Sequence, residues 1–350
     1  MNLPRQPVRL MLSVWAIAAT SALAASTDWQ RITPAGASCW DGSPWHFFYR
    51  TGTSQRLAIF FGSGDACWSA PLCAALAHAP VDLPGPPAAG LFDGARAANP
   101  LADFAQVWLP DCTFDMQTGD RTVSYQSRGA APLEVAHVGA ANVRAALAAL
   151  QTRITPPREI FVGGDGSGGI AAAYWSMRIG ERWPSAQLVV LGAGAGGYRS
   201  RAANDALTQW GALDDLPDLP VFADRHKVYF ESFYIATAQR FPEARLGAVN
   251  FANDAVQRRL MRAFGTPVAS LSKPLQCNMN EVRINAAGFH SFMVPGTQHA
   301  ILGSDAVYAL HCEAQNLSAW IGDLVSGEPI ETHWCDGELT LHTSRTAAPL

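Results

Sequence analysis

The sequence predicts an α/β fold with a mostly parallel central sheet and helices on both faces. From about residue 105 onward, short apolar runs typical of buried strands alternate with longer helical patterns, an order that favours parallel strands joined by helices. The strand-like run 159–164 also leads through several glycines directly into the small-residue helix expected at 169–183. With 49% hydrophobic and 15% charged residues, the composition is that of an ordinary globular protein.

The expected elements follow this pattern along the chain. Residues 26–60 form a β region, because 46–50 and 56–61 are strand-like runs joined by a short polar link, as in a hairpin. Residues 79–100 are rich in Pro, Gly and Ala and are expected to form a long irregular loop. The apolar run 291–296 precedes His299. The other expected strands are 105–110, 159–164, 187–194 and 244–253, and the expected helices are 137–154, 169–183, 230–241, 254–264 and 307–325.

The first 24 residues have the pattern of a cleaved secretory signal peptide, which leaves residues 25–350 as a single domain. Arg5 and Arg9 precede an apolar stretch, and Ala22-Leu23-Ala24 fits a small-x-small cleavage site. An uncleaved anchor is disfavoured because the apolar stretch is shorter than the ~20 residues that span a membrane. Loss of the two arginines changes the net charge from −4 to −6. We therefore expect a secreted or periplasmic protein without a membrane span.

Cysteine usage agrees with export. None of the seven cysteines forms a CxxC pair, and the histidines lack metal-ligand spacing, so we expect disulfides rather than a metal site. The favoured pairs are Cys67 with Cys73 and Cys312 with Cys335, and the odd number leaves at least one thiol free or paired outside the chain. The low charged fraction gives no basic patch for nucleic acid. No metal and no organic cofactor is expected.

The glycine-rich stretch 160–172 has three interpretations. Residues 164–169 and 192–197 both fit the dinucleotide-binding pattern G-x-G-x-x-G, but the strand after the first match lacks the expected acidic residue. A trypsin-like GDSGG is displaced by one residue and belongs to an all-β fold. A nucleophile elbow fits best, because a sharp strand-to-helix turn needs small neighbours and carries its reactive side chain at the tip.

An elbow of this kind needs an acid and then a histidine on later loops. Asp254 and His299 are the candidates in the right order, and Asp115 and Asp205 are rival acids. A histidine base would take the proton of the nucleophile, and the acid would orient the imidazole. Asp254 is equally suited to cap the helix expected at 254–264.

Several segments together resemble the pectin acetylesterase/Notum family of secreted α/β-hydrolases. FFGSGDACW is similar to the family's F-x-G-G-G-x-C-W turn, which holds the oxyanion hole, and HVGAANV resembles its H-x-G-x-x-N-V helix start. LPDCTFDMQTGD resembles its P-Y-C-T-G-D-x-x-x-G-D stretch. NDAVQ and VPGTQHAIL resemble the segments that supply the catalytic acid and histidine, which points to Asp254 and His299. The resemblance implies an α/β-hydrolase-like fold and a serine ester hydrolase.

The chain departs from that family at the residues that matter most. A gapless match to the family's elbow G-C-S-A-G-G places Gly166 at the nucleophile and puts the nearest hydroxyl one residue late, at Ser167. Ser63-Gly64-Asp65 replaces three glycines, and an ionised Asp65 would oppose an oxyanion there. Phe114 replaces a glycine of the third motif.

Two functions follow from these residues. In the first, Ser167, Asp254 and His299 form a catalytic triad, Ser63, Gly64, Asp65, Gly166 and Gly168 form the oxyanion turn and elbow, and the substrate is an acylated carbohydrate or a small ester. In the second, Ser167 only caps the following helix, and the protein binds a glycan or a protein without cleaving it. Trp68, Trp175 and Trp210 are expected near the cleft, where they would contact a sugar or belong to the core.

Overall fold

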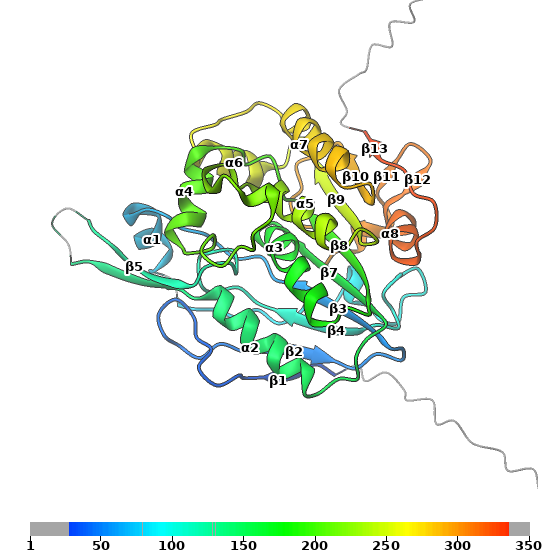
Figure 1. Cartoon of the computed structure of the whole chain (residues 1–350), viewed down its shortest axis with the longest axis horizontal. Coiled ribbons are helices and arrows are strands. Elements are labelled where there is room, and N and C mark those ends of the chain that lie inside the picture. Colours follow the sequence, from blue (N-terminus) through cyan, green and yellow to red (C-terminus); the bar gives the residue numbers. More distant parts are fainter. Residues whose placement is uncertain (1–27, 79, 128, 130, 336–350) are drawn as a thin grey trace, which may run out of the picture.

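The computed structural model describes residues 28–78, 80–127, 129 and 131–335 (Figure 1), so the expected signal peptide lies outside the described residues. A nine-stranded sheet runs through the centre, and only β2 is antiparallel to its neighbours. This arrangement confirms the predicted α/β class with a mostly parallel sheet. In sheet order the strands are β1 (Gln30–Ile32), β2 (Phe47–Arg50), β4 (Ala105–Leu109), β3 (Arg56–Phe61), β7 (Glu159–Asp165), β8 (Gln187–Ala193), β9 (Arg245–Phe251), β10 (Phe289–Val294) and β13 (His333–Trp334).

Helices cover both faces of the sheet, because its central strands alternate apolar side chains between two cores. In β3, Leu57, Ile59 and Phe61 belong to the larger core, which also contains side chains of α2, α3, α5 and α7. Ala58 and Phe60 point to the other side and pack in the core that contains α8. The bounds of these helices are Gly139–Gln151 for α2, Ser167–Arg182 for α3, Phe230–Arg240 for α5, Ser272–Asn285 for α7 and Leu317–Ser326 for α8.

The remaining elements lie around the sheet. The antiparallel hairpin of β5 and β6 projects from the body of the molecule in Figure 1. These elements are the helices α1 (Ala70–Leu76), α4 (Arg201–Gln209) and α6 (Ala255–Ala263), the strands β5 (Arg121–Tyr125), β6 (Leu133–His137), β11 (His311–Cys312) and β12 (Gln315–Asn316), and the 3₁₀ turns η1 (Gly90–Phe92), η2 (Pro220–Phe222), η3 (Arg225–Lys227) and η4 (Asp305–Tyr308).

The hairpin expected from residues 46–61 does not form. Strand β4 lies between β2 and β3 and pairs with both. Five of the six residues of β3 are buried, so this strand needs a hydrogen-bonded neighbour on each side, and it takes β4 and β7. The short link after β2 therefore crosses to a central position instead of turning back.

Two helix expectations also need correction. Within 307–325 only the second half is helical, because Asn316 caps α8 by accepting the N–H groups of Ser318 and Ala319 and Cys312 lies in the short strand β11. The helix expected to begin at residue 137 begins at Gly139, after β6. Helices α1, α4 and α7 have no counterpart among the expected elements.

Candidate active site

A tight turn at Gly166 joins the end of β7 to the start of α3. Gly166 has φ 56° and ψ −122°, a backbone conformation that glycine adopts at little cost. A Cβ atom on Gly168 would lie 2.1 Å from the carbonyl oxygen of Phe61, and one on Gly164 would lie 2.4 Å from the backbone of Gly168. The close packing explains the run of glycines. The residue at the tip of the turn is Gly166, as the gapless match predicts.

His299 and Asp254 lie beside this turn and contact each other. Asp254 follows β9 and is completely buried, and its Oδ2 lies 2.7 Å from Nδ1 of His299. A proton on Nδ1 that is donated to this carboxylate leaves Nε2 as the free acceptor of the ring. A Cβ atom on Gly166 would lie only 2.3 Å from that Nε2. The imidazole therefore faces the tip of the turn, where it is placed to accept a proton.

Asp254 serves two purposes with its two oxygens. Its Oδ1 accepts the N–H groups of Val256 and Gln257, each at 2.9 Å, and thereby caps α6. Its Oδ2 accepts from His299 and, at 3.1 Å, from the side-chain amide of Gln257. Asp254 thus caps α6 and also contacts His299, and its role as the catalytic acid stays a prediction. The rival acids lie elsewhere: Asp205 is an exposed residue of α4 beside Arg201, and Asp115 bonds the backbone of the loop before α2.

Ser167 is the first residue of α3 and contacts the turn opposite. Its Oγ accepts the N–H of Gly64 at 2.7 Å and donates to the carbonyl oxygen of the same residue at 2.9 Å. The hydrogen bonds of the described residues do not include one between Ser167 and His299. Ser167 as the nucleophile therefore stays a prediction, and in this structure its hydroxyl holds the 63–65 turn against α3.

Ser63 and Asp65 flank Gly64 in this turn, and both are exposed. The Oγ of Ser63 donates to the carbonyl oxygen of Asp165 at 2.7 Å. It also lies 2.6 Å from the point where a Cβ atom on Gly166 would be. Asp65 lies close enough to the buried Asp111 to help raise the pKa of that carboxyl, although burial is the larger cause. The predicted turn residues are thus gathered around the elbow.

Asp165 ties the elbow to the loop that carries His299, a role that the sequence did not reveal. Its carboxylate accepts the N–H of Ile301 at 2.8 Å and that of Leu302 at 3.2 Å. Burial raises the pKa of Asp165 to about 6, and these hydrogen bonds and the nearby His299 oppose the rise. In the sequence, the only sign of this role is that an acidic residue directly precedes Gly166. We read Asp165 as a positioning residue.

A cavity of about 370 Å³ opens over the elbow, within the usual size range of ligand pockets. Its polar wall includes Ser63, Asp65, Ser167 and His299. Most of the other lining is apolar and comes from α1, α6 and the start of α3, which suits an acyl chain or another apolar group. Apolar residues in this wall include Trp68, Leu72, Met116, Ile170, Tyr198 and Leu260.

The tryptophans expected near the cleft divide between surface and core. Trp68 lines the cavity and stacks on Phe264 with ring centroids 4.4 Å apart. Trp175 and Trp210 are each only 1% exposed, so they belong to the core. Their indole N–H groups donate to backbone carbonyl oxygens, as buried tryptophans require. Trp68 is the one of the three with access to a ligand.

The loop 111–118 supports the cavity through an unusual backbone. Phe114, Met116 and Gln117 all have positive φ values near 55°, which is uncommon for residues other than glycine. Phe114 thus adopts the left-handed conformation at the position where the family pattern has glycine. The completely buried Asp115 holds the loop by accepting from Thr113 and from the N–H groups of Gln117 and Gly139. Burial and the neighbouring Asp111 raise its pKa well above the usual range.

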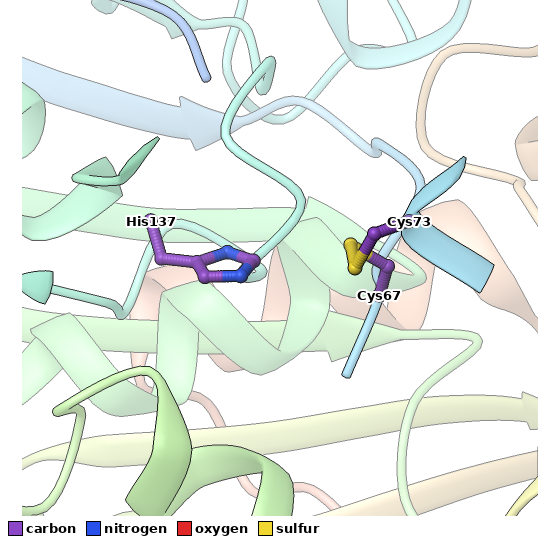
Figure 2. Close-up of side chains that lie close together, drawn as sticks. All are labelled: Cys67, Cys73 and His137. Atoms are coloured by element: carbon purple, nitrogen blue, oxygen red, sulfur yellow. A yellow bond between two sulfur atoms is a disulfide. The ribbon is translucent and has the colours of Figure 1, made fainter. Parts of the chain in front are cut away.

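One group of three potential metal ligands occurs among the described residues, namely Cys67, Cys73 and His137, with ligand atoms within 4.8 Å of one another. Figure 2 shows that the two sulfur atoms are joined to each other. In the disulfide they are not thiolates, the form that binds metals. His137 bonds the carbonyl oxygen of Thr113 and the hydroxyl of Tyr125. In this oxidised form the group is a structural contact.

All three disulfides lie among the described residues. Cys67–Cys73 and Cys312–Cys335 match the favoured pairs, and Cys39–Cys112 joins the N-terminal segment to the loop before the elbow. The free thiol is that of the exposed Cys277.

Comparisons with known proteins add no assignment to this geometry. No family model matches the chain, and no curated protein matches it. Within the described ranges, no helix is both long and apolar enough to cross a membrane.

Proposed function

We propose that this protein is a secreted carboxylic-ester hydrolase of the α/β-hydrolase class, related to the pectin acetylesterase/Notum family. The observation that carries the proposal is the His299–Asp254 pair. A completely buried carboxylate lies 2.7 Å from Nδ1 of His299, and Nε2 faces the tip of a strand-to-helix turn. This is the arrangement that a general base needs in acyl transfer.

The topology supports the same proposal. The elbow follows β7, Asp254 follows β9 and His299 follows β10, so the elements occur in the chain order elbow, acid, histidine. The three strands are parallel, with β9 next to β10 and only β8 between β7 and β9. Their carboxyl ends therefore lie at the same edge of the sheet. Ligand sites of open parallel sheets lie at that edge.

The cavity supports a substrate with an apolar acyl group. Its polar atoms gather at Ser63, Ser167 and His299, while α1 and α6 supply apolar walls. Trp68 provides an aromatic surface on which a sugar ring could stack. An acylated carbohydrate or a small ester fits this division. The three disulfides are typical of a protein made for an oxidising compartment.

The test is esterase activity of the purified mature chain. Short-chain p-nitrophenyl esters and acetylated polysaccharides are assayed with the wild type, His299→Ala and Asp254→Asn. We expect kcat/KM to fall at least ~100-fold in His299→Ala, because a general base contributes about 10²–10⁴-fold. Asp254→Asn keeps the cap of α6 and loses the charge that orients the imidazole. Activity that survives in a folded His299→Ala variant, or no activity in the wild type, contradicts the proposal.

A second candidate function rests on a different observation. Gly166 carries no hydroxyl at the tip, and the Oγ of Ser167 is held by both backbone groups of Gly64. On this candidate the cavity binds an acylated glycan or a protein and leaves it intact. A folded wild type that binds such a ligand by calorimetry, yet releases no acid from it over hours, would favour this candidate over the first.

A further inference from the structure

The elbow has a base and a tip but no reactive group at the tip. Nε2 of His299 approaches Gly166 so closely that a Cβ atom there would lie 2.3 Å away. The next residue, Ser167, uses both the donor and an acceptor site of its hydroxyl on Gly64. Ser167 would have to break two hydrogen bonds to reach the base, whereas the other hydroxyl near the tip, that of Ser63, has one.

Ser63 brings a hydroxyl to the same place from the opposite side. Its Oγ lies 2.6 Å from the point where a Cβ atom of Gly166 would be, and Nε2 of His299 lies 2.3 Å from that point. The two atoms can therefore be no farther apart than the sum of these distances, 4.9 Å. To form a hydrogen bond, the Oγ of Ser63 has to approach Nε2 of His299 by about 2 Å at most. A change of the side-chain rotamer of Ser63 moves its Oγ by more than this distance.

The environment of Ser63 is also that of an accessible group. Ser63 is exposed and lines the cavity over the elbow and two adjoining cavities of about 260 and 220 Å³. An ester placed across this junction would have room on both sides of its carbonyl group. Ser167, by contrast, is half-buried and lines only the first of these cavities.

The present hydrogen bond of Ser63 can be exchanged. Its hydroxyl donates to the carbonyl oxygen of Asp165, the residue just before the tip. When the hydroxyl turns toward His299, this carbonyl remains in a position accessible to water. The backbone of the turn stays in place, because Ser167 holds Gly64 through two hydrogen bonds.

We propose that Ser63 is the nucleophile of this site, with His299 as its base. The proposal rests on the ester-hydrolase function proposed above and names the group that performs its first step. Ser167 then acts as a positioning residue that fixes the turn on which Ser63 lies. The start of α3 places the positive end of the helix dipole beside Ser63, which favours the anionic intermediate.

The chemistry balances without a cofactor. The Oγ of Ser63 attacks the acyl carbon, and its proton passes to Nε2 of His299. The bond to the leaving oxygen breaks, and that oxygen takes the proton from the imidazole, which leaves an acyl ester on Ser63. A water molecule then attacks the acyl carbon, gives one proton to His299, and releases the carboxylic acid as Ser63 recovers its proton. The sum is ester plus water to acid plus alcohol.

The test is labelling with a fluorophosphonate, read by intact mass and by peptide mapping after reduction. Trypsin places Ser63 in the peptide 57–96 and Ser167 in the peptide 159–178, and fragmentation separates Ser63 from Ser69. The wild type, Ser63→Ala, Ser167→Ala and His299→Ala are compared, each shown to be folded by circular dichroism and thermal unfolding. Esterase activity is measured on the same samples.

We expect one adduct on Ser63 in the wild type and none in Ser63→Ala, whose kcat should fall at least 100-fold. Ser167→Ala should still be labelled on Ser63, at a rate lowered a few-fold because the turn is less firmly held. An adduct on Ser167, or esterase activity that persists in Ser63→Ala and depends on His299, overturns the assignment of Ser63 while the ester-hydrolase function stands. No adduct and no activity in the folded wild type overturns both.

Discussion

Gly166 determines what the site can do at the scale of single residues. The tip of the turn needs a positive φ, and the imidazole of His299 lies where the side chain of any other residue would begin. Glycine meets both conditions, whereas an L-residue meets neither without a cost. The pair of His299 and Asp254 thus lies beside a turn whose tip presents no hydroxyl.

Gly166→Ser should create the missing hydroxyl at the tip. The positive φ costs about 1–2 kcal/mol in a residue with a Cβ atom, and the imidazole must move back to an ordinary contact distance. In a Ser63→Ala background we expect this change to restore fluorophosphonate labelling, now at position 166. Mass mapping of the double variant checks this outcome, and Gly166→Ala in the same background is the matched control.

Restored labelling in the alanine control as well would mean that the reaction does not use the new hydroxyl. No labelling of a folded serine variant would mean that His299 cannot act on a side chain at the tip. Either result would contradict the view that Nε2 is directed at this point.

At the scale of elements, the elbow and the loop 297–304 behave as one unit because Asp165 joins them. Its carboxylate accepts from the N–H groups of Ile301 and Leu302, which lie two and three residues past His299. The position of the imidazole therefore depends on an acid of β7 as well as on Asp254. A charged group is kept there although burial raises its pKa to about 6.

Because the pKa of Asp165 is raised, the difference in stability between the wild type and Asp165→Asn should depend on pH. Because the pKa of Asp165 in the folded state lies above the ordinary value of 3.8 for an aspartic acid, the folded protein binds the extra proton between about pH 4 and pH 6. The contribution of this carboxyl to the free energy of unfolding therefore falls as the pH rises through that window and is constant above it. Asp165→Asn lacks the titration, so its free energy of unfolding relative to the wild type should rise by up to about 3 kcal/mol between pH 4 and pH 7.

Urea unfolding of both proteins at four pH values between 4 and 7 measures this difference. Asp111, whose pKa burial also raises to about 6, is present in both proteins, so its titration cancels in the comparison. Parallel pH profiles for wild type and variant would contradict the prediction. They would mean that Asp165 titrates alike in the folded and unfolded chains.

Part of the site and of the arrangement of elements could be predicted from the sequence. Asp254 and His299 could be found because each follows an apolar strand and resembles a family segment, and the structure brings them together. The direction of Ser63 could not be found, because it depends on the path of the 63–65 turn past α3. The helix expected over 307–325 was wrong because periodicity alone does not register the cap at Asn316 or the disulfide at Cys312.

Long-range contacts decided the elements that sequence patterns assigned wrongly. The hairpin pattern of 46–61 is locally reasonable, yet the buried strand β3 gains two parallel neighbours only if β4 is inserted beside it. Helix α7 buries Leu275, Met279 and Val282, which recur at helical spacing, so the sequence pattern did contain this helix. It packs against α5 and β10. Packing partners far along the chain are not visible in a window of a dozen residues.

At the scale of the whole molecule, the disulfides constrain the chain by unequal amounts. Cys39 and Cys112 are 73 residues apart, whereas Cys67 and Cys73 are only 6 apart. In the loop-entropy model the longer link contributes about 4 kcal/mol and the shorter about 2 kcal/mol. Cys39→Ser/Cys112→Ser should therefore lower the free energy of unfolding about twice as much as Cys67→Ser/Cys73→Ser does.

Denaturant unfolding of the two double variants at one pH measures both losses in the free energy of unfolding. The third disulfide, Cys312–Cys335, provides a comparison at an intermediate separation of 23 residues. Equal losses for the long and the short link would contradict the entropic account. The Cys39–Cys112 variant should also lose the proposed esterase activity, because Cys112 lies in the loop 111–118, which contributes Met116 to the cavity wall.

The group formed by Cys67, Cys73 and His137 has a practical consequence for recombinant production. A reducing bacterial cytoplasm would open the short disulfide and leave two thiols and an imidazole within 4.8 Å of one another. Burial lowers the pKa of His137 to about 4, so the ring is neutral and able to coordinate. Elemental analysis of protein made there would test whether these three groups bind zinc, whereas in material exported to the periplasm the disulfide withholds both sulfur atoms from a metal.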